Sequence, residues 1–115
     1  MTGYVDRYLQ PKVRLVVKGL RQTLPIEVVV DTGFNGDLCL PIPFAIQLGL
    51  ELCADREFEL ADGSIRQELI FIGQAILENE ERDVLISLTH SAEALFGCGL
   101  LKGQKLEIGF AARTA

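Results

Sequence analysis

Apolar and polar residues alternate along much of the chain, and this pattern predicts strands. Apolar residues occupy alternate positions within Lys12 to Leu20, as expected of a strand that buries one face. The next apolar segment, Leu24 to Val30, ends in three successive valines, which predicts a strand buried on both faces near its end. This second strand runs directly into Asp31.

A turn signal follows in the middle of the chain. Apolar and acidic residues alternate up to Asp62-Gly63, and Ile65 to Ile72 supplies a returning strand. Asp-Gly between two such segments is the strongest short-range signal of a tight turn, so we predict a β-hairpin centred on it. Before the hairpin, Pro43 to Leu48 followed by Gly49 predicts a short helix, since proline favours the first turn and glycine the end.

The remaining segments predict further strands and a second helical turn. The charged residues from Glu78 to Arg82 predict a solvated turn, and Cys98 to Lys102 predicts one helical turn stopped by Gly103. No linker or repeat separates these elements, so we predict one domain over residues 1–115, built as a small mainly-β barrel with a covered interior. Further apolar runs and strands are expected at Leu38 to Pro41, Gln74 to Leu77, Asp83 to Leu88, Ala94 to Phe96 and Lys105 to Phe110.

Composition narrows the class of function. With 115 residues, 49% of them hydrophobic, the chain can form one modest core but not two. Its 16 acidic and 11 basic residues give a net charge of -5, which disfavours nucleic acid and anionic membrane surfaces as partners. No apolar run approaches the roughly 20 residues that cross a bilayer, and the first residues lack an export signal. We therefore expect a cytoplasmic protein.

The cysteines and the histidine limit metal and redox chemistry. Cys39, Cys53 and Cys98 show no paired short spacing, which favours small core-lining thiols over a disulfide framework or a thiolate metal site. His90 is the only histidine in the sequence, which leaves a histidine-rich metal site without ligands. We therefore expect no metal and no cofactor.

The acidic residue at the end of the second predicted strand is the candidate for chemistry. Burying a carboxylate there is costly unless hydrogen-bond donors or a partner surround it. Asp31-Thr32-Gly33 is also compatible with an ordinary strand-ending turn, because Asp and Gly are common in turns. The triplet alone does not decide between a catalytic loop and a turn.

Four successive segments together resemble the retropepsin-like aspartic proteases, especially the short bacterial members. They are an apolar strand entering Asp-Thr-Gly, a small-residue loop and strand, a hairpin near the position of the family's flap, and a second hallmark of two hydrophobic residues and a glycine before a short helix. Phe34, where many members have Ala or Ser, and Cys98, where many have a charged or polar residue, depart from the family pattern. The segments are Ile26 to Gly33, Phe34 to Pro41, Leu60 to Ser64, and Ala94 to Leu101.

The resemblance implies a closed retropepsin-like acid protease barrel, one lobe per chain, with peptidase activity. It makes Asp31 the catalytic residue, with Thr32 and Gly33 supporting its loop. Because the chain has one such triplet and is too short for a duplicated enzyme, the second carboxylate has to come from another copy, which implies a homodimer. The two carboxylates would hold a water and share one proton, with activity on the acidic side, against a peptide or protein substrate in extended conformation.

The resemblance also implies roles for two further segments. The hairpin would fold over the bound peptide as a flap, although an inert turn has the same sequence. The glycine of the second hallmark would lie beneath the catalytic loop, although a plain helix-start glycine is the alternative. The residues are Ala61, Asp62, Gly63 and Ser64 for the flap, and Leu95, Phe96 and Gly97 for the second hallmark.

Rival sites and functions remain open at this point. Asp37 or Asp55 would supply a second carboxylate within one chain, but both are more simply solvated loop residues. His90 and Ser91 are neighbours in sequence and so do not face one another as a nucleophile pair would. An alternative function is a dimer of the same fold with little or no activity that acts as a peptide-binding or assembly module. An unrelated small β-barrel is the third interpretation.

Overall fold

The computed structural model of the chain describes residues 2–110, apart from the side chain of Phe58. Within this part the chain forms eight strands, one α-helix and one 3-10 helix. The strands are β1 (Tyr4–Val5), β2 (Pro11–Lys18), β3 (Thr23–Val30), β4 (Leu38–Pro41), β5 (Glu51–Glu59), β6 (Ile65–Leu77), β7 (Glu80–Thr89) and β8 (Ala94–Phe96). The helices are α1 (Ile42–Leu48) and the 3-10 helix η1 (Cys98–Leu100).

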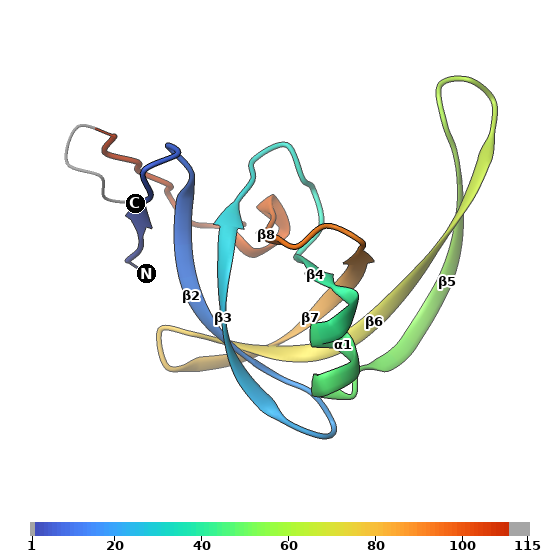
Figure 1. Cartoon of the computed structure of the whole chain (residues 1–115), viewed down its shortest axis with the longest axis horizontal. Coiled ribbons are helices and arrows are strands. Elements are labelled where there is room, and N and C mark those ends of the chain that lie inside the picture. The colour runs from blue at the N-terminus through green and yellow to red at the C-terminus, as the bar shows by residue number, and fades with distance from the viewer. Residues whose placement is uncertain (1, 111–115) are drawn as a thin grey trace.

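Most of the strands close into a barrel. The order along the sheet is β1-β2-β3-β8-β4-β7-β6-β5, and an additional pairing between β2 and β6 joins the two sides. This pairing leaves β1 and β5 outside the ring, as Figure 1 shows. The prediction of a mainly-β closed barrel with one or two short helices is therefore confirmed.

The first hairpin of the barrel follows the alternation of its sequence. β2 buries its alternating apolar residues and pairs antiparallel with β3. In β3, too, only alternate residues are fully buried, while Glu27 is exposed and forms an ion pair with Lys12 at 3.5 Å. The prediction of burial on both faces near the end of β3 holds only in part, because Val28 and Val30 are buried whereas Val29, on the outer face, is half-buried.

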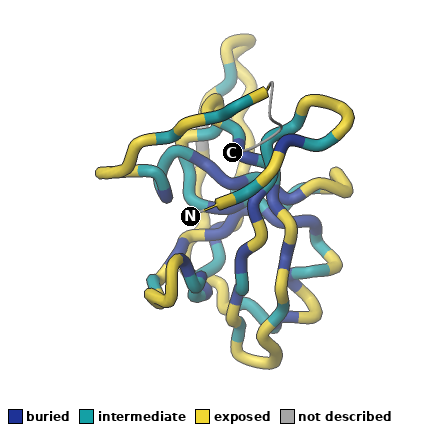
Figure 2. Tube along the Cα trace, turned by 90° about the vertical axis from the view of Figure 1, so that its left-hand side faces the viewer, coloured by how far each residue is buried: buried dark blue, intermediate teal, exposed yellow. Residues whose placement is uncertain are grey.

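The core is the barrel interior. Phe96, Leu15 and Leu38 are among the largest side chains that are completely buried there. Figure 2 shows buried positions concentrated in the strands at the centre of the molecule and exposed ones at the turns. Each large apolar side chain buried in this way contributes about 1.5–3 kcal/mol to stability. Every barrel strand contributes buried side chains to this core. The packing therefore holds the strands in place and fixes the positions of their ends.

The helix α1 packs against β4 and β7 at one end of the barrel. Pro43 lies in its first turn, and Gly49 ends it in a left-handed conformation with φ 68°. Both features match the prediction of a helix from Pro43 to Leu48, which the structure extends by one residue. Within residues 2–110, no helix combines the length and the apolar character needed to span a membrane.

The predicted hairpin is present and is much longer than expected. β5 and the outer half of β6 pair antiparallel and extend away from the barrel (Figure 1); residues 51–72 are called the arm below. β6 then continues without a break into the barrel, where it pairs with β2 and β7. The sequence predicted two strands interrupted at Gly73, but that glycine lies inside one strand. A Cβ there would lie 3.1 Å from side-chain atoms of Ile86 and Leu50, so the glycine permits a close approach.

The turn after β6 is shorter than predicted. β6 reaches Leu77 and β7 begins at Glu80, so the connection consists of Glu78 and Asn79 instead of the whole charged segment. Both residues have positive φ, 51° and 66°. This conformation is typical of a two-residue hairpin turn whose twist matches that of the flanking strands.

The segment after β8 confirms one prediction and overturns another. η1 and Gly103, with φ 80°, form the predicted helical turn and its stop. Lys105 to Phe110 was predicted as a strand, but it forms only a single bridge at Gly109. Leu106 and Ile108 are half-buried, so the alternation is real. The ladder of hydrogen bonds that defines a strand is missing from this segment.

Candidate active site

Asp31 lies where β3 ends and the chain turns. Its amide donates to the Phe96 carbonyl of β8 at 2.9 Å, and its Oδ1 accepts the N–H of Gly33 at 2.9 Å. The residue is half-buried. Within residues 2–110, its other carboxylate oxygen has no hydrogen-bond partner. One oxygen is therefore oriented by the loop itself, through the glycine of the Asp-Thr-Gly triplet.

β8 connects this loop to the second hallmark. It runs parallel to β3, with Val30 opposite Phe96, and antiparallel to β4, with Leu38 opposite Phe96. The short strand therefore lies between the strand that enters the Asp31 loop and the strand that leaves it. The fold brings Leu95, Phe96 and Gly97 beside Asp31, which the spacing along the sequence does not reveal.

Three backbone hydrogen bonds attach the loop after Asp31 to the turn after β8. All three are formed by consecutive amides of that turn, so the two loops move together. They run from the amides of Gly97, Cys98 and Gly99 to the carbonyls of Asp37, Phe34 and Gly36, at 2.8, 2.8 and 3.0 Å.

Gly97 is buried directly beneath this loop. A Cβ at position 97 would collide with the carbonyl oxygen of Gly36 and would lie 2.6 Å from Cδ2 of Phe34. Backbone atoms cannot move aside as a flexible side-chain end can. The close packing explains why a glycine stands here, whereas the alternative of a plain helix-start glycine makes no such demand.

Asp37 was expected to be a solvated loop residue, and the structure corrects this. Its side chain is half-buried, and its Oδ2 accepts the N–H of Leu85 in β7 at 3.0 Å. A Cβ on Gly99 would collide with the other carboxylate oxygen. Asp37 therefore connects the loop to β7 through its carboxylate. The sequence gives little signal for this role, since it depends on a residue 48 positions away.

The three cysteines differ in their surroundings. Cys98 is half-buried and its thiol donates to the carbonyl of Thr32 at 3.2 Å, so it contacts the Asp-Thr-Gly loop. Burial raises the pKa of the Cys39 thiol, which favours its protonated form. Cys53 is exposed on the arm, so the expectation that all three thiols line the core is wrong. Thr32 itself is exposed.

The tip of the arm holds the predicted flap residues. The amide of Gly63 donates to the carbonyl of Leu60 at 2.9 Å, with Gly63 at φ 85°, and the Asp62 carboxylate accepts both the amide and the hydroxyl of Ser64. The bond from the Ser64 hydroxyl, followed by that from its amide, lowers the pKa of Asp62. All four residues from Ala61 to Ser64 are exposed. In Figure 1 the tip lies well away from the end of β3, so the single chain does not bring these residues to Asp31.

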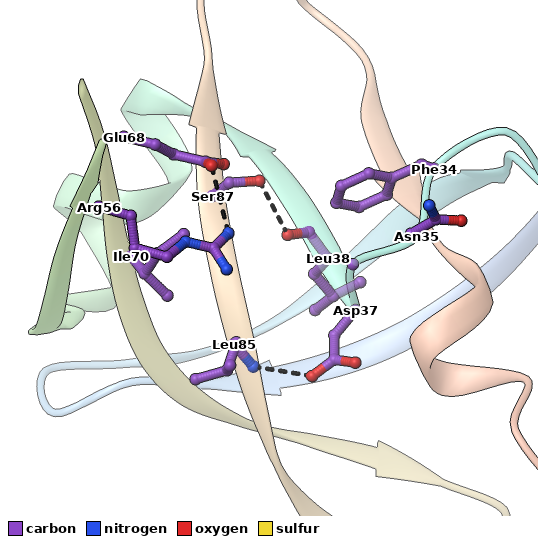
Figure 3. A pocket seen from close by; sticks show the side chains of 10 residues that line it. Phe34, Asn35, Asp37, Leu38, Arg56, Glu68, Ile70, Leu85 and Ser87 are labelled. Atoms are coloured by element: carbon purple, nitrogen blue, oxygen red, sulfur yellow. Dashed lines mark hydrogen bonds and ion pairs between the residues drawn. The ribbon is translucent and has the colours of Figure 1, made fainter. Parts of the chain in front are cut away.

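A cleft of about 450 Å³ lies between the arm and the loop that follows Asp31. Figure 3 shows the ring of Phe34 on one side and the side chains of Arg56 and Glu68 on the other. Asp31 precedes the lining residues Phe34 to Leu38 in the same loop, but Asp31 itself does not line the cleft. The lining residues are Phe34, Asn35, Gly36, Asp37, Leu38, Arg56, Glu68, Ile70, Leu85 and Ser87.

Sequence reasoning missed the arm's contribution to this cleft. Arg56 and Glu68 are direct cross-strand partners in the register of β5 and β6, so their side chains share one face, and they form an ion pair at 3.2 Å. Ala54 and Ile70 are the next pair on that face. The Asp62-Gly63 turn was the usable signal, because the turn of a hairpin sets the register of the strands on either side. The length of the turn was not known from the sequence, so the pairing of Arg56 with Glu68 could not be obtained by counting residues outward from it.

The rival site residues lie elsewhere. Asp55 is exposed on β5, opposite Leu69, and accepts a long hydrogen bond from Gln67 at 3.5 Å. His90 and Ser91 are exposed after β7, where the Ser91 amide donates to Thr89. Among the described residues, no group of three or more His, Cys, Asp or Glu side chains could hold a metal ion.

No protein-family model matches the sequence, and no curated protein does either. Solved structures match the fold. The closed barrel of β2, β3, β8, β4, β7 and β6 has the fold of the retropepsin-like aspartic proteases.

Two solved proteins illustrate the likeness. A retropepsin-like aspartic protease from Rickettsia conorii has a TM-score of 0.74 at 18% identity, over 99% of this chain and 86% of its own. EIAV protease, solved with the inhibitor HBY-793, has a TM-score of 0.62 at 14% identity, over 90% of this chain and 97% of its own. At these identities the likeness establishes the fold, which is retropepsin-like.

Proposed function

We propose that the protein is an aspartic endopeptidase, active as a homodimer, that hydrolyses peptide bonds with a water held between two Asp31 carboxyls. The observation that supports this most directly is the placement of Asp31. Its loop is anchored by backbone hydrogen bonds to β8 and η1, while Asp31 is half-buried and, among the described residues, only one of its carboxylate oxygens accepts a hydrogen bond. The bond from the Gly33 amide alone is an Asx turn like those at Asp6 and Asp62, so the support comes from the position of Asp31 at the end of a barrel strand, beside β8.

The chemistry requires two carboxylates with different protonation. One removes a proton from the water as it attacks the peptide carbon, and the other donates a proton to the carbonyl oxygen. Two carboxylates a few ångströms apart share one proton because ionising both is costly. Activity should therefore peak where the pair carries one proton, on the acidic side, and fall at lower and higher pH.

The remaining residues would support this pair. Thr32, an exposed residue, would donate through its hydroxyl to neighbouring groups and hold the carboxylates coplanar, and Gly33 holds one Asp31 oxygen through its amide. The flap residues Ala61, Asp62, Gly63 and Ser64 would close over an extended peptide and bind its backbone. The distance of the tip from Asp31 in the single chain fits a flap that reaches its working position in a dimer with substrate.

The solution setting follows from the sequence and the thiols. Cys39, Cys53 and Cys98 are all free, which suits a reducing compartment, and we place the protein in the cytoplasm. The net charge of -5 argues against nucleic acid or an anionic membrane as a partner. No metal or cofactor enters the mechanism.

The decisive experiment mixes two forms of the protein. Asp31→Asn should abolish cleavage of an unfolded protein substrate at mildly acidic pH and leave the mass of the dimer in solution unchanged. Each site needs two carboxylates, so only dimers of two wild-type chains should be active. When wild-type and Asp31→Asn chains are mixed at constant total concentration and exchange subunits, activity should therefore fall as the square of the wild-type fraction. A linear loss would mean that one chain suffices, and undiminished turnover by the variant would refute the role of Asp31.

The same experiment separates the alternative function. A catalytically weak dimer that serves as a peptide-binding or assembly module would bind peptides without cleaving them at any pH between 4 and 7, an interval of about three units around the range expected for a shared proton. The observation that favours this alternative is Phe34, a departure from the family pattern, whose ring packs against Gly97 and against Gly36 in the loop beside Asp31. Peptide binding without turnover in the wild-type protein would favour it.

A further inference from the structure

The cleft beside the Asp31 loop has an apolar floor and a charged wall. Leu38 and Ile70 are buried beneath it, while Leu85, also lining it, remains 48% exposed. At about 450 Å³ the cleft lies within the range of about 300–1,000 Å³ typical of sites that enclose a small ligand or a large side chain. An apolar surface left open inside such a cleft is suited to an apolar group of the substrate.

The charged wall consists of one ion pair. Nη2 of Arg56 lies 3.2 Å from Oε2 of Glu68, with side-chain exposures of 63% and 31%. This is the one hydrogen bond that the Arg56 guanidinium forms within residues 2–110, although a guanidinium has five N–H donors. Arg56 therefore has N–H donors to spare, but its positive charge is balanced by the negative charge of Glu68.

The charges around the cleft sum to an excess of negative charge. Arg56 contributes one positive charge, whereas Glu68 and Asp37 each contribute a negative one. Asp37 already accepts the N–H of Leu85, so its charge is partly compensated by a backbone dipole. An acidic side chain of a substrate would compete with Glu68 for the guanidinium of Arg56, and the carboxylate of Glu68 would repel it.

We propose that the Arg56–Glu68 pair sets the charge selectivity of the cleft: Glu68 balances the charge of Arg56 and, together with Asp37, leaves the cleft negative, so that it accepts a large uncharged side chain and rejects an acidic one. This inference rests on the proposed function, because it treats the cleft as part of a peptide-binding site. Removing the Glu68 charge frees a cation at the cleft wall. The cleft then accepts an acidic side chain.

The test uses a peptide scan. One extended peptide that the protein cleaves is prepared with Leu, Gln or Glu at each position in turn, and cleavage rates are measured for the wild type and for Glu68→Gln. Affinities are measured in parallel with the Asp31→Asn protein, with and without Glu68→Gln. At one position, the preference for Leu over Glu should shrink by about three- to tenfold in Glu68→Gln, as expected for a partly exposed charge pair. The Leu to Gln ratio should stay constant.

Two variants serve as controls. Glu57 lies next to Arg56 on β5, pairs with Gln67, and points to the opposite face of the arm. Glu57→Gln removes the same charge from the same strand and should leave all ratios unchanged. In the double variant Arg56→Gln with Glu68→Gln, the gain for Glu should disappear, because the cation that would bind it is gone.

The outcomes distinguish this inference from the peptidase proposal. Selective binding that responds to Glu68→Gln, without cleavage by the wild type, would support the inference and overturn the peptidase. If the protein cleaves the peptides and the ratio of the rates for Leu and Glu is the same in the wild type and in Glu68→Gln at every position, the peptidase proposal is supported and the inference about the cleft is overturned. An equal change in Glu57→Gln would also overturn the inference, since it would point to the overall charge of the arm. Absence of both binding and cleavage would refute both proposals.

Discussion

The Asp31 loop and the arm form opposite sides of one cleft, and they are built in opposite ways. The loop is held by backbone hydrogen bonds to three consecutive amides after β8, with glycines at positions where any side chain would collide. The arm is held along most of its length by the ladder between β5 and β6, with Phe71 and Ile72 at its base also paired with β7, and large apolar residues such as Ile65 and Leu69 are exposed on it. One side of the cleft is fixed by packing, whereas the other is free to be reshaped by a partner or a substrate.

The largest effect on the fixed side is expected from Phe96→Ala. Phe96 is completely buried between β3 and β4, so its removal leaves a cavity in the centre of the barrel. The free energy of unfolding should fall by about 3–5 kcal/mol. Urea denaturation measures this directly, and a loss below 1 kcal/mol, the low end for buried deletions, would show that Phe96 is not part of a packed core.

Gly97→Ala should follow closely. The added methyl collides with the Gly36 carbonyl, so the Asp31 loop has to shift, and the free energy of unfolding should fall by about 3 kcal/mol. Cleavage should fall even under conditions where the variant is folded. Gly103→Ala is the matched control, because nothing lies within 4 Å of the added atom and only the strain of its positive φ remains. Equal losses in the two variants would contradict a specific contact at Gly97.

Asp37 tests the attachment of the loop to β7. Asp37→Ala removes the acceptor of the exposed Leu85 amide, which water can partly replace, and should cost about 0.5–1.5 kcal/mol in the free energy of unfolding. Asp37→Asn retains an oxygen acceptor at the same place and should restore most of that loss. If Asn and Ala destabilise the protein equally, the charge of Asp37 is what matters, and the hydrogen bond to Leu85 is not the main contribution.

The smallest effect is expected at the tip of the arm. The Ser64 hydroxyl lowers the pKa of Asp62, so this contribution to the turn is present above the ordinary pKa of an aspartate and is lost as the pH falls through the lowered value. Ser64→Ala should raise the pKa of Asp62 toward its ordinary value, as NMR titration of that carboxyl would show. The overall free energy of unfolding should not change measurably, since the tip is exposed. A global loss of stability would mean that the arm is coupled to the barrel more tightly than its contacts indicate.

The same contrast explains how far the sequence predicts the structure. Alternation in β2 and the Asp62-Gly63 turn depend on neighbours along the chain, and both were predicted correctly. The predicted strands ended before Gly73 and resumed after it, whereas β6 is continuous there. The sequence does not reveal why a glycine stands inside the strand, because the close approach of Leu50, Ile86 and the Lys18 carbonyl exists only in the assembled barrel. Lys105 to Phe110 has the alternation of a strand without the neighbouring ladder that would make it one.

The candidate site divides along the same line. Asp31, Thr32 and Gly33 are contiguous, and their motif is recognisable in the sequence. Asp37 was assigned to solvent because its partner, Leu85, lies on a distant strand. Arg56 and Glu68 were not singled out, because their meeting depends on the register of two long strands. Residues that act through distant partners are those that local patterns do not reveal.

β6 belongs to both the barrel and the arm, and this continuity constrains how the arm can change position. A lid attached by loops swings on a few flexible residues, but the arm has no such joint on the β6 side. Its direction can change only if an unbroken strand bends or twists, and Gly73, at the point where the strand enters the barrel wall, is the natural place for that bend. Any movement of the tip would then also load the ladder that joins β6 to β2 and β7.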